Sequence, residues 1–187
     1  MNMINSDGLL EFPHANAPPG TLLRKILYQG LEEHPYFGFY VDMFHQGRTV
    51  GFSRSEIMDQ WTDQPLISFR FATCYPLIAN NPLLTHSQAI HVSRDPWFPT
   101  DMEKLERRVK EWKAAGDKVL MFTTNRSALG REIDEWGLLF GRDYVPIHAD
   151  TDSRFEVVFD VQKQLLFVQL ADAKLLQISG LTQKFNV

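Results

Sequence analysis

Apolar residues recur along this chain with two different periods, and the clearest helical period follows residue 100. Four large apolar residues fall on one face of a helix there: Met102, Leu105, Val109 and Trp112. Thr100 and Glu103 have the spacing of a capping box, and Gly116 suits the left-handed position that ends a helix. The pattern predicts a helix that starts at Thr100 and ends at Gly116.

A strand, a polar turn, a second helix and another strand are expected directly afterwards. Lys118–Phe122 is an apolar run of strand length, and the polar turn Thr123-Thr124-Asn125-Arg126-Ser127 follows it. The next helix ends at Gly141 and has one apolar face, made of Leu129, Ile133, Trp136 and Phe140. Tyr144–His148 is the following strand, and Pro146 predicts that it lies at a sheet edge or is short.

The rest of the chain favours strands, with two shorter helices. Near the carboxyl terminus, the expected strands are Phe155–Val161 and Gln164–Leu170, paired as a hairpin, and Leu175–Ile178. Earlier in the chain they are Pro65–Tyr75, Gln88–Ser93 and a hairpin of Tyr36–Phe44 with Arg48–Phe52. Helices are expected from Thr21 to about Glu33, and from Ser53 or Ser55 to near Trp61. The proline-rich residues 1–20 predict an irregular arm.

These elements predict an α+β (mixed α/β) fold with a mixed sheet and an N-terminal extension of helix plus hairpin. With 187 residues, the chain suits a single domain, 1–187. The only position that suits a division is near residues 79–87, which gives an N-terminal part, 1–87, and a C-terminal part, 88–187.

Composition narrows the function classes. The formal net charge of −4 argues against a protein that coats nucleic acid through bulk charge, although a local basic groove is compatible with it. The single cysteine, Cys74, excludes an intrachain disulfide, favours a reducing compartment and is expected to be a buried, inert thiol. Neither a signal-peptide pattern nor a long apolar run is present, so we expect a cytoplasmic protein, free or peripheral at the inner membrane.

The polar turn of residues 123–127 is the first candidate site. A helix that starts after a buried strand presents free backbone N–H groups and the positive end of its dipole, which suit an anion. Thr124, Asn125 or Ser127 can cap the helix, and Arg126 adds a cation whose planar fork matches phosphate oxygens. The alternative is ordinary capping with Arg126 in solvent.

Charged residues around this turn are secondary candidates. Glu132 and Glu135 are three residues apart, so both can lie on one side of the helix and hold Mg²⁺ or position a water, or form a solvated charged face. Arg94, in a turn before the first helix, is a second anion contact or part of a rigid turn. The basic residues of that helix are interleaved with glutamates, which favours pairing on a wet face over a DNA surface. Histidine spacing suggests no metal site, and no Walker, HExxH, GxSxG or CxxC motif is present.

The order of elements from His91 to His148 resembles the core of the ParB/sulfiredoxin superfamily. The matching pieces are HVSRDPWFP, LERRVKEWKAAG, KVLMFTTNRSALGRE and RDYVPIHAD. Asn125 falls where sulfiredoxins have their catalytic cysteine, so reductase chemistry is not implied. The resemblance implies a ParB/sulfiredoxin-like core with ATP bound by Thr123, Thr124, Asn125, Arg126 and Ser127. The nucleotide-contacting arginine is Arg126, with Arg131 as the second choice.

Within that superfamily, the chain is similar to plasmid-encoded fertility-inhibition proteins. The likeness implies ATPase and Mg-dependent DNase activity that blocks transfer of DNA through a type IV secretion system. ATP and Mg²⁺ would be the cofactors, with Arg126, Glu132 and Glu135 as the catalytic residues, Glu132 as the metal ligand, and Arg131 and Arg94 as further phosphate contacts. DNA (the transferred strand, in a local basic groove) and secretion components would be the partners. Two alternatives stay open: a noncatalytic protein-binding inhibitor or immunity-type protein, supported by the high aromatic content, and a ligand-binding domain without turnover.

Overall fold

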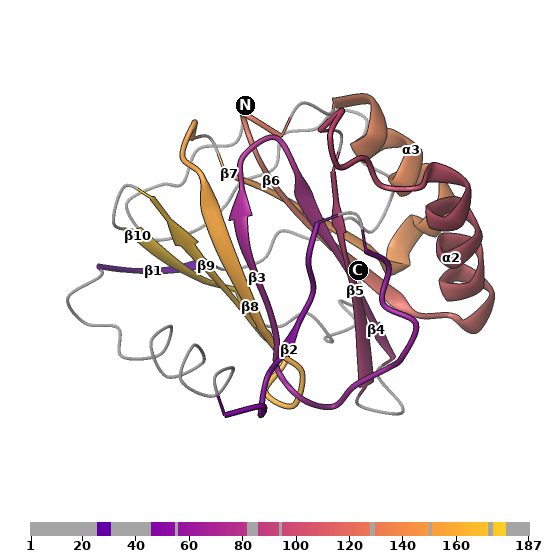
Figure 1. The fold of residues 1–187 in the computed structure, drawn as a ribbon, viewed down its shortest axis with the longest axis horizontal. Helices are drawn as coiled ribbons and strands as arrows, with labels where there is room; N and C mark the ends of the chain where they lie inside the picture. The colour runs from indigo at the N-terminus through magenta and orange to yellow at the C-terminus, as the bar shows by residue number, and fades with distance from the viewer. Residues whose placement is uncertain are drawn as a thin grey trace.

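Two β-sheets and two α-helices build the part of the chain that this computed structural model describes. The described residues are 26–30, 46–54, 56–81, 86–93, 95–127, 130–149, 151–171 and 174–178. Within them, side chains are not described for 26–30, 131–134, 142 and 174–178. The six-stranded sheet, the four-stranded sheet and the helices follow one another as three layers (Figure 1).

The six-stranded sheet has the order β1-β10-β9-β8-β3-β2. Its strands are β1 (Ile26–Gly30), β2 (Val50–Gly51), β3 (Leu66–Phe71), β8 (Phe155–Asp160), β9 (Leu165–Leu170) and β10 (Lys174–Ile178). All neighbours are antiparallel except β2 and β3, which are parallel.

The four-stranded sheet has the order β5-β4-β6-β7. Its strands are β4 (Tyr75–Asn81), β5 (His86–Val92), β6 (Lys118–Thr124) and β7 (Tyr144–Ala149). Neighbours are antiparallel except β6 and β7. The helices α2 (Met102–Ala115) and α3 (Gly130–Phe140) cover the face that points away from the other sheet, and the short 3₁₀ helix η2 (Gly141–Asp143) leads from α3 into β7 (Figure 1).

The four-stranded sheet is buried on both faces, which explains why β6 reads as a continuous apolar run. Val119 and Met121 pack in the cluster that contains Leu105, Val109 and Trp112 of α2. Leu120 and Phe122 pack in the cluster between the two sheets. Aromatic rings contact each other in that cluster, where Phe71 stacks on Phe155 at a centroid distance of 4.8 Å.

The segment from Arg54 to Thr62 covers the free edge of β5 and is not the expected short helix. Isolated bridges join Arg54, Ile57 and Thr62 to β5, and the Ile57 side chain is buried. Protecting an exposed strand edge outweighs the weak helical pattern of this segment. The prediction of a helix from Ser53 or Ser55 to Trp61 was wrong, with Ser55 itself outside the described residues.

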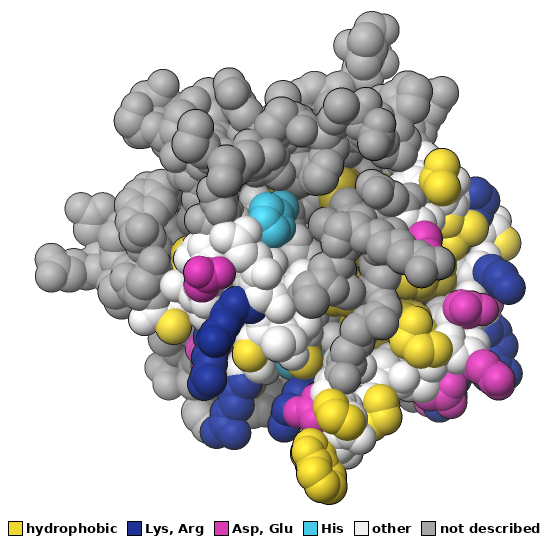
Figure 2. Space-filling model, turned by 90° about the horizontal axis from the view of Figure 1, so that it is seen from above, with side chains coloured by type: hydrophobic (Ala, Val, Ile, Leu, Met, Phe, Trp, Pro, Cys, Tyr) yellow, Lys and Arg dark blue, Asp and Glu magenta, His cyan; other side chains and the backbone are white. Residues whose placement is uncertain are grey.

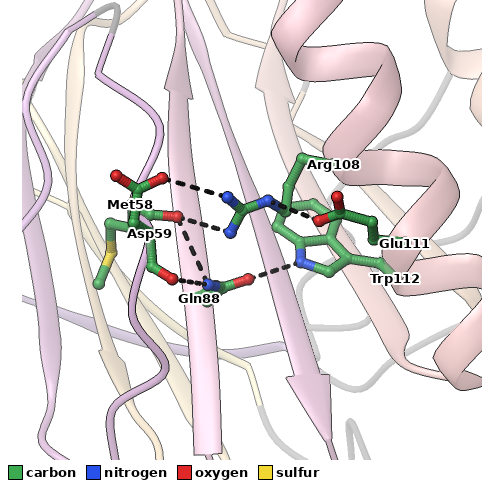
Figure 3. Close-up of polar contacts among 6 residues, drawn as sticks. All are labelled: Met58, Asp59, Gln88, Arg108, Glu111 and Trp112. Carbon is green, nitrogen blue, oxygen red and sulfur yellow. Dashed lines mark hydrogen bonds and ion pairs between the residues drawn. The ribbon is translucent and has the colours of Figure 1, made fainter.

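A polar network ties this segment to α2 and β5 (Figure 3). The Arg108 guanidinium donates to the Met58 carbonyl at 2.9 Å and pairs with Asp59 at 3.2 Å and Glu111 at 3.1 Å. Gln88 donates its amide to the Asp59 carbonyl at 3.1 Å and accepts from the Trp112 indole at 2.9 Å. The network therefore satisfies the buried polar atoms of Gln88 and Trp112.

Two other local predictions were wrong. Residues 26–30, expected within a helix, form β1, because a neighbouring strand, β10, supplies backbone partners that the local sequence does not reveal. The N-cap of α2 is Asp101, whose carboxylate accepts from the Lys104 amide at 3.1 Å. The Thr100 hydroxyl is instead buried and accepts from the Ser93 amide at 2.8 Å.

The strand predictions before residue 93 need adjustment. The run expected as one strand, Pro65–Tyr75, is divided into β3 and the start of β4. The polar run Asn80-Asn81-Pro82 suggests a break, but Asn80 and Asn81 belong to β4, and Pro82 lies outside the described residues. In the expected hairpin of residues 36–52, the first strand lies outside the described residues, and Val50–Gly51 pairs in parallel with β3.

The second half agrees well with expectation. α2 ends at Gly116, which is left-handed with φ 72, and β6, α3, β7, the β8–β9 hairpin and β10 all form. β7 is an edge strand, as Pro146 predicted. The mixed α/β class is confirmed, although the chain forms two mixed sheets where one was expected.

Candidate functional site

The parallel pair β6 and β7, with α3 between them along the chain, brings two carboxyl ends together. In this pair Thr123 lies opposite His148, and Thr124 opposite Ala149. The carboxyl ends of parallel strands are where open α/β sheets bind ligands, because connecting loops leave a crevice there. The polar turn of residues 123–127 is therefore at the position where a ligand is expected.

Hydrogen bonds within the protein hold this turn closed. The Ser127 amide donates to the Thr124 carbonyl at 3.0 Å, and the Thr124 amide donates to the Ser127 hydroxyl at 3.1 Å. The Ser127 hydroxyl in turn donates to the Cys74 carbonyl at 3.2 Å. Because Thr123, Thr124 and Ser127 are buried, their hydroxyls shape the turn and do not face solvent.

A chain of side-chain hydrogen bonds runs across the strand ends. His148 Nε2 lies 3.0 Å from Asn125 Oδ1, and His148 Nδ1 lies 2.9 Å from the Thr123 hydroxyl. Since the amide oxygen of Asn125 only accepts, this arrangement assigns a proton to Nε2 of His148. The Thr123 hydroxyl, which faces Nδ1, also lies within 3.4 Å of the Ile147 carbonyl as a donor. The network orients Asn125, an exposed residue of the turn.

Arg126 is the exposed cation of the turn. Among the side chains that the structure describes, none forms an ion pair or hydrogen bond with its guanidinium. Its backbone is held by its neighbours, since the Asn125 amide donates to the Thr151 carbonyl at 3.0 Å. Arg126 thus presents a permanent positive charge near the carboxyl ends of β6 and β7.

The structure does not bring every predicted residue to this turn. Arg131, Glu132 and Glu135 all lie on α3, where Glu135 is exposed and the side chains of Arg131 and Glu132 are not described. Arg94 lies outside the described residues. The assignments of Arg94, Arg131, Glu132 and Glu135 to phosphate, metal or water therefore stay predictions.

His148 is the site residue that sequence reasoning missed. A signal existed, because His148 ends the strand that follows the second helix, and parallel pairing places such a residue beside the polar turn.

A buried serine–histidine pair lies elsewhere, between β3 and β5, and its serine is not activated as a nucleophile. Ser68 Oγ donates to the Phe52 carbonyl at 2.5 Å and lies 2.9 Å from His91 Nδ1. Because the Ser68 hydroxyl donates its proton to the Phe52 carbonyl, His91 donates from Nδ1 to Ser68 Oγ. His91 therefore cannot act as a base that activates Ser68. Burial, with the nearby charge of Arg54, lowers the pKa of His91 to about 3. The pair is therefore a structural element of the core.

The described residues contain no group of three or more His, Cys, Asp or Glu that could hold a metal ion. Cys74 is buried, as expected. The groove along the outer face of α2 is lined by both acidic and basic residues, Glu103, Glu106, Arg107, Lys110 and Glu111, together with Ala114. This mixture agrees with the expected pairing of charges on that helix.

The sequence matches no protein-family model and no curated protein. None of the described helices has the length and apolarity that crossing a membrane requires.

Proposed function

We propose that the turn of residues 123–127 binds the phosphate groups of a nucleotide. The observation that carries this proposal is the exposed Arg126 at the carboxyl ends of two parallel strands, just before α3. Arg126 would neutralise phosphate charge, and the side-chain amide of Asn125, oriented by His148, would add a hydrogen bond.

The wider proposal follows the resemblance to the ParB/sulfiredoxin superfamily. The order β5, α2, β6, α3, β7 is the order of elements in that core and supports a ParB/sulfiredoxin-like unit. On this proposal the chain is a plasmid fertility-inhibition factor in the cytoplasm, or peripheral at the inner membrane, that blocks DNA transfer through a type IV secretion system. It would act as an ATPase and a Mg-dependent DNase.

The residue roles of the proposal follow from the chemistry of phosphoryl transfer, which depends mainly on positioning and on stabilising charge. Arg126 would stabilise the developing charge, with Arg131 and Arg94 as further phosphate contacts. Glu132 would hold Mg²⁺ and Glu135 would orient the attacking water.

The experiment measures Mg·ATP binding, phosphate release and degradation of linear DNA with purified native protein and the variants Arg126→Ala, Glu132→Ala and Arg107→Ala. Arg107 is exposed on α2 and serves as the matched control. We expect Mg·ATP to raise the melting temperature of the native protein and of Arg107→Ala. Arg126→Ala should lose at least about tenfold in nucleotide affinity, since one charge-assisted contact contributes roughly 1.5–3 kcal/mol, and Glu132→Ala should lose turnover.

Equal nucleotide binding by native protein and Arg126→Ala would contradict the proposed site. Phosphate release that survives both Arg126→Ala and Glu132→Ala would assign the activity to another site or to a contaminant.

A noncatalytic protein-binding inhibitor is the second candidate. The observation that favours it is Leu138 on α3, whose side chain is 84 % exposed. Burying such a side chain against a partner would contribute about 25 cal/mol for each Å² of apolar surface removed from water. Absence of any nucleotide-dependent change in melting temperature would favour this candidate.

A further inference from the structure

The loop between β5 and α2 holds an exposed tryptophan on a rigid turn. The Trp97 side chain is 84 % exposed and its neighbour Phe98 is 54 % exposed. The Asp95 carboxylate accepts from the Trp97 amide at 2.9 Å, and the Asp95 carbonyl accepts from the Phe98 amide at 3.0 Å. Because the backbone is fixed while a large apolar ring stays in water, the turn presents the indole for contact with a partner.

The base of this turn is fixed as firmly as its tip. The Ser93 amide donates to the Thr100 hydroxyl at 2.8 Å, and the Thr100 amide donates to the Ser93 carbonyl at 2.9 Å. Arg54 pairs with Asp95 at 3.3 Å and lies 5.0 Å from the centre of the Phe98 ring. These contacts fix the backbone that carries the Trp97 side chain and limit the conformational entropy that the turn loses when a partner binds.

The Trp97 turn and the candidate nucleotide site lie at the same end of the molecule. Val92, the last residue of β5, pairs with Tyr75, the first residue of β4. Because β4 is also antiparallel to β6, the carboxyl end of β5 lies at the same end of the sheet as the carboxyl ends of β6 and β7. This end is uppermost in Figure 1, and Figure 2 looks down on it.

Exposed arginines gather at this same end. Arg126 lies in the turn after β6, and Arg154 directly precedes β8. Arg70 is exposed beside the irregular end of β3, where its φ of 62 turns the strand. Phe71 lies opposite Phe155, so Arg70 and Arg154 occupy the ends of two paired strands. In Figure 2, Lys and Arg side chains lie at the lower left and along the right of this view, and hydrophobic side chains project at the bottom.

We infer that this aromatic–arginine face, defined by Trp97, Phe98, Arg70, Arg126 and Arg154, binds single-stranded nucleic acid. A base would stack on the Trp97 indole, and phosphates would contact the arginines. This inference rests on the proposed function for DNA as the partner, and it adds the strand form and the residues. Bases of a duplex are stacked on each other and cannot reach an aromatic ring, whereas every unpaired base can.

The arginines suit any anionic partner, and the exposed Trp97 ring is the feature that favours nucleic acid over an acidic protein. The whole chain has a formal net charge of −4, so arginines placed at one end are an exception to its general charge. Glu156 and Asp152 are close in sequence to Arg154, and Glu156 interacts with Arg70, which keeps the face from being uniformly basic. A mixed face with one presented ring suits weak, sequence-tolerant binding that combines stacking with phosphate contacts.

The first test measures fluorescence anisotropy of a labelled oligothymidylate of about 20 nucleotides, longer than most single binding sites, with no nucleotide cofactor added. Native protein should bind it at least about tenfold more tightly than a blunt duplex of equal length. Trp97→Ala should lose about 5- to 100-fold in oligothymidylate affinity, as expected for one lost base-stacking contact. Leu138→Ala, which removes an equally exposed apolar side chain from α3, should bind as the native protein does.

The second test measures the dependence of oligothymidylate affinity on salt concentration. For single strands, each lost phosphate contact lowers the steepness of the log–log plot by about 0.7. The double variant Arg70→Ala/Arg154→Ala should therefore lower it by about 1.4. The control Lys110→Ala/Lys163→Ala, with one substitution on α2 and one at the opposite end of β8, should leave it unchanged.

Three results would overturn the inference: no binding of oligothymidylate, equal binding of single strand and duplex, or native affinity in Trp97→Ala. The first of these would assign the Trp97 turn to a protein partner. Mg·ATP binding is measured separately, by melting temperature, so the two proposals can fail independently. Oligothymidylate binding without a nucleotide effect would leave this inference standing and refute the nucleotide site. The opposite result would refute this inference alone.

Discussion

His91 is a buried histidine whose two ring nitrogens differ in their hydrogen bonding. Nδ1 meets Ser68, while Nε2 has no hydrogen-bond partner among the described residues, and the ring stacks on Phe71 at 3.8 Å. The pKa of His91 is lowered to about 3, mainly by burial. Between pH 6.5 and about 3, the unfolded chain therefore binds a proton that the folded chain does not.

This difference predicts a loss of stability on acidification. Above pH 6.5, His91 is neutral in both states and its protonation does not lower the free energy of unfolding. As pH falls from 6.5 toward 3, the free energy of unfolding decreases by at most about 1.4 kcal/mol per pH unit. His91→Phe keeps a ring against Phe71 but cannot bind a proton. Urea unfolding at pH 7 and pH 5 should show a smaller loss of unfolding free energy in His91→Phe than in native protein. Parallel losses in both proteins would disprove this assignment.

Asp117 makes the opposite contribution. Neither of its carboxylate oxygens has a hydrogen-bond partner of ordinary geometry in the described part of the chain. Burial raises the pKa of Asp117 above its ordinary value, and the nearby Asn81 side chain offsets part of that rise. The charged form is therefore unfavourable in the folded protein, and its cost grows as pH rises above 3.8.

Asp117→Asn should consequently stabilise the protein at pH 7, by about 1–3 kcal/mol if the cost is that of one unsatisfied buried group. The gain should shrink as pH falls toward 3.8, and below that pH the carboxyl of the native sequence becomes protonated in both states. Unfolding free energies of both proteins at pH 7 and pH 4.5 measure this difference. Equal stability at pH 7 would show that the carboxylate has a partner in solution.

At the level of residues, the candidate site was predictable in part. The turn Thr123–Ser127 follows from its position between an apolar strand and a helix. The partner of Asn125 does not, because His148 is 23 residues away in sequence and meets Asn125 only through the β6–β7 register. The burial of Ser127 depends on the still more distant Cys74 carbonyl. Long-range contacts of this kind have no local sequence signal.

Among the elements, α2 makes its polar contacts with the segment that covers β5 through one cation, beside the apolar packing of Ile57. The Arg108 side chain is only 17 % exposed and joins Met58, Asp59 and Glu111 (Figure 3). Arg108→Ala should lower the unfolding free energy by about 1–3 kcal/mol, because it leaves the Met58 carbonyl with a poorer hydrogen bond and removes a partly buried ion pair.

Lys110→Ala is the matched control for Arg108→Ala, since Lys110 is exposed on the same helix. It should change the unfolding free energy by no more than about 0.5 kcal/mol. Denaturant titrations of both variants measure the difference. Equal stabilities would mean that the network of Figure 3 does not hold the segment in solution.

Elements were predictable where local and tertiary preferences agree. α2 has an apolar face, a helix-ending glycine and a burial pattern that all favour helix, so an error in its cap, Asp101 in place of Thr100, changed nothing else. Residues 26–30 and 54–62 lack such agreement. Their structure is decided by pairing with β10 and with β5, and these partners are distant in sequence.

For the whole molecule, the arrangement of the two sheets determines how the chain can be divided. The sequence suggested parts 1–87 and 88–187, but β4 lies between β5 and β6, and β3 lies beside β8. The position 87/88 also falls inside β5. The strands β3 and β4 of the first part are thus needed to complete the sheets of the second.

This arrangement predicts that residues 88–187 do not fold alone. Without β4, one side of β6 loses its antiparallel neighbour, and the cluster that buries Leu120 and Phe122 loses the side chains that residues before 88 contribute, Leu66 and Ile78 among them. Without Phe71, the Phe155 ring loses a stacked partner in the core between the sheets. A fragment of residues 88–187 should give an amide NMR spectrum with little dispersion and no cooperative melting transition, while the full chain melts in one transition. A dispersed spectrum from the fragment would establish an independent C-terminal unit, and the nucleotide and nucleic-acid sites would then have to be tested on that unit separately.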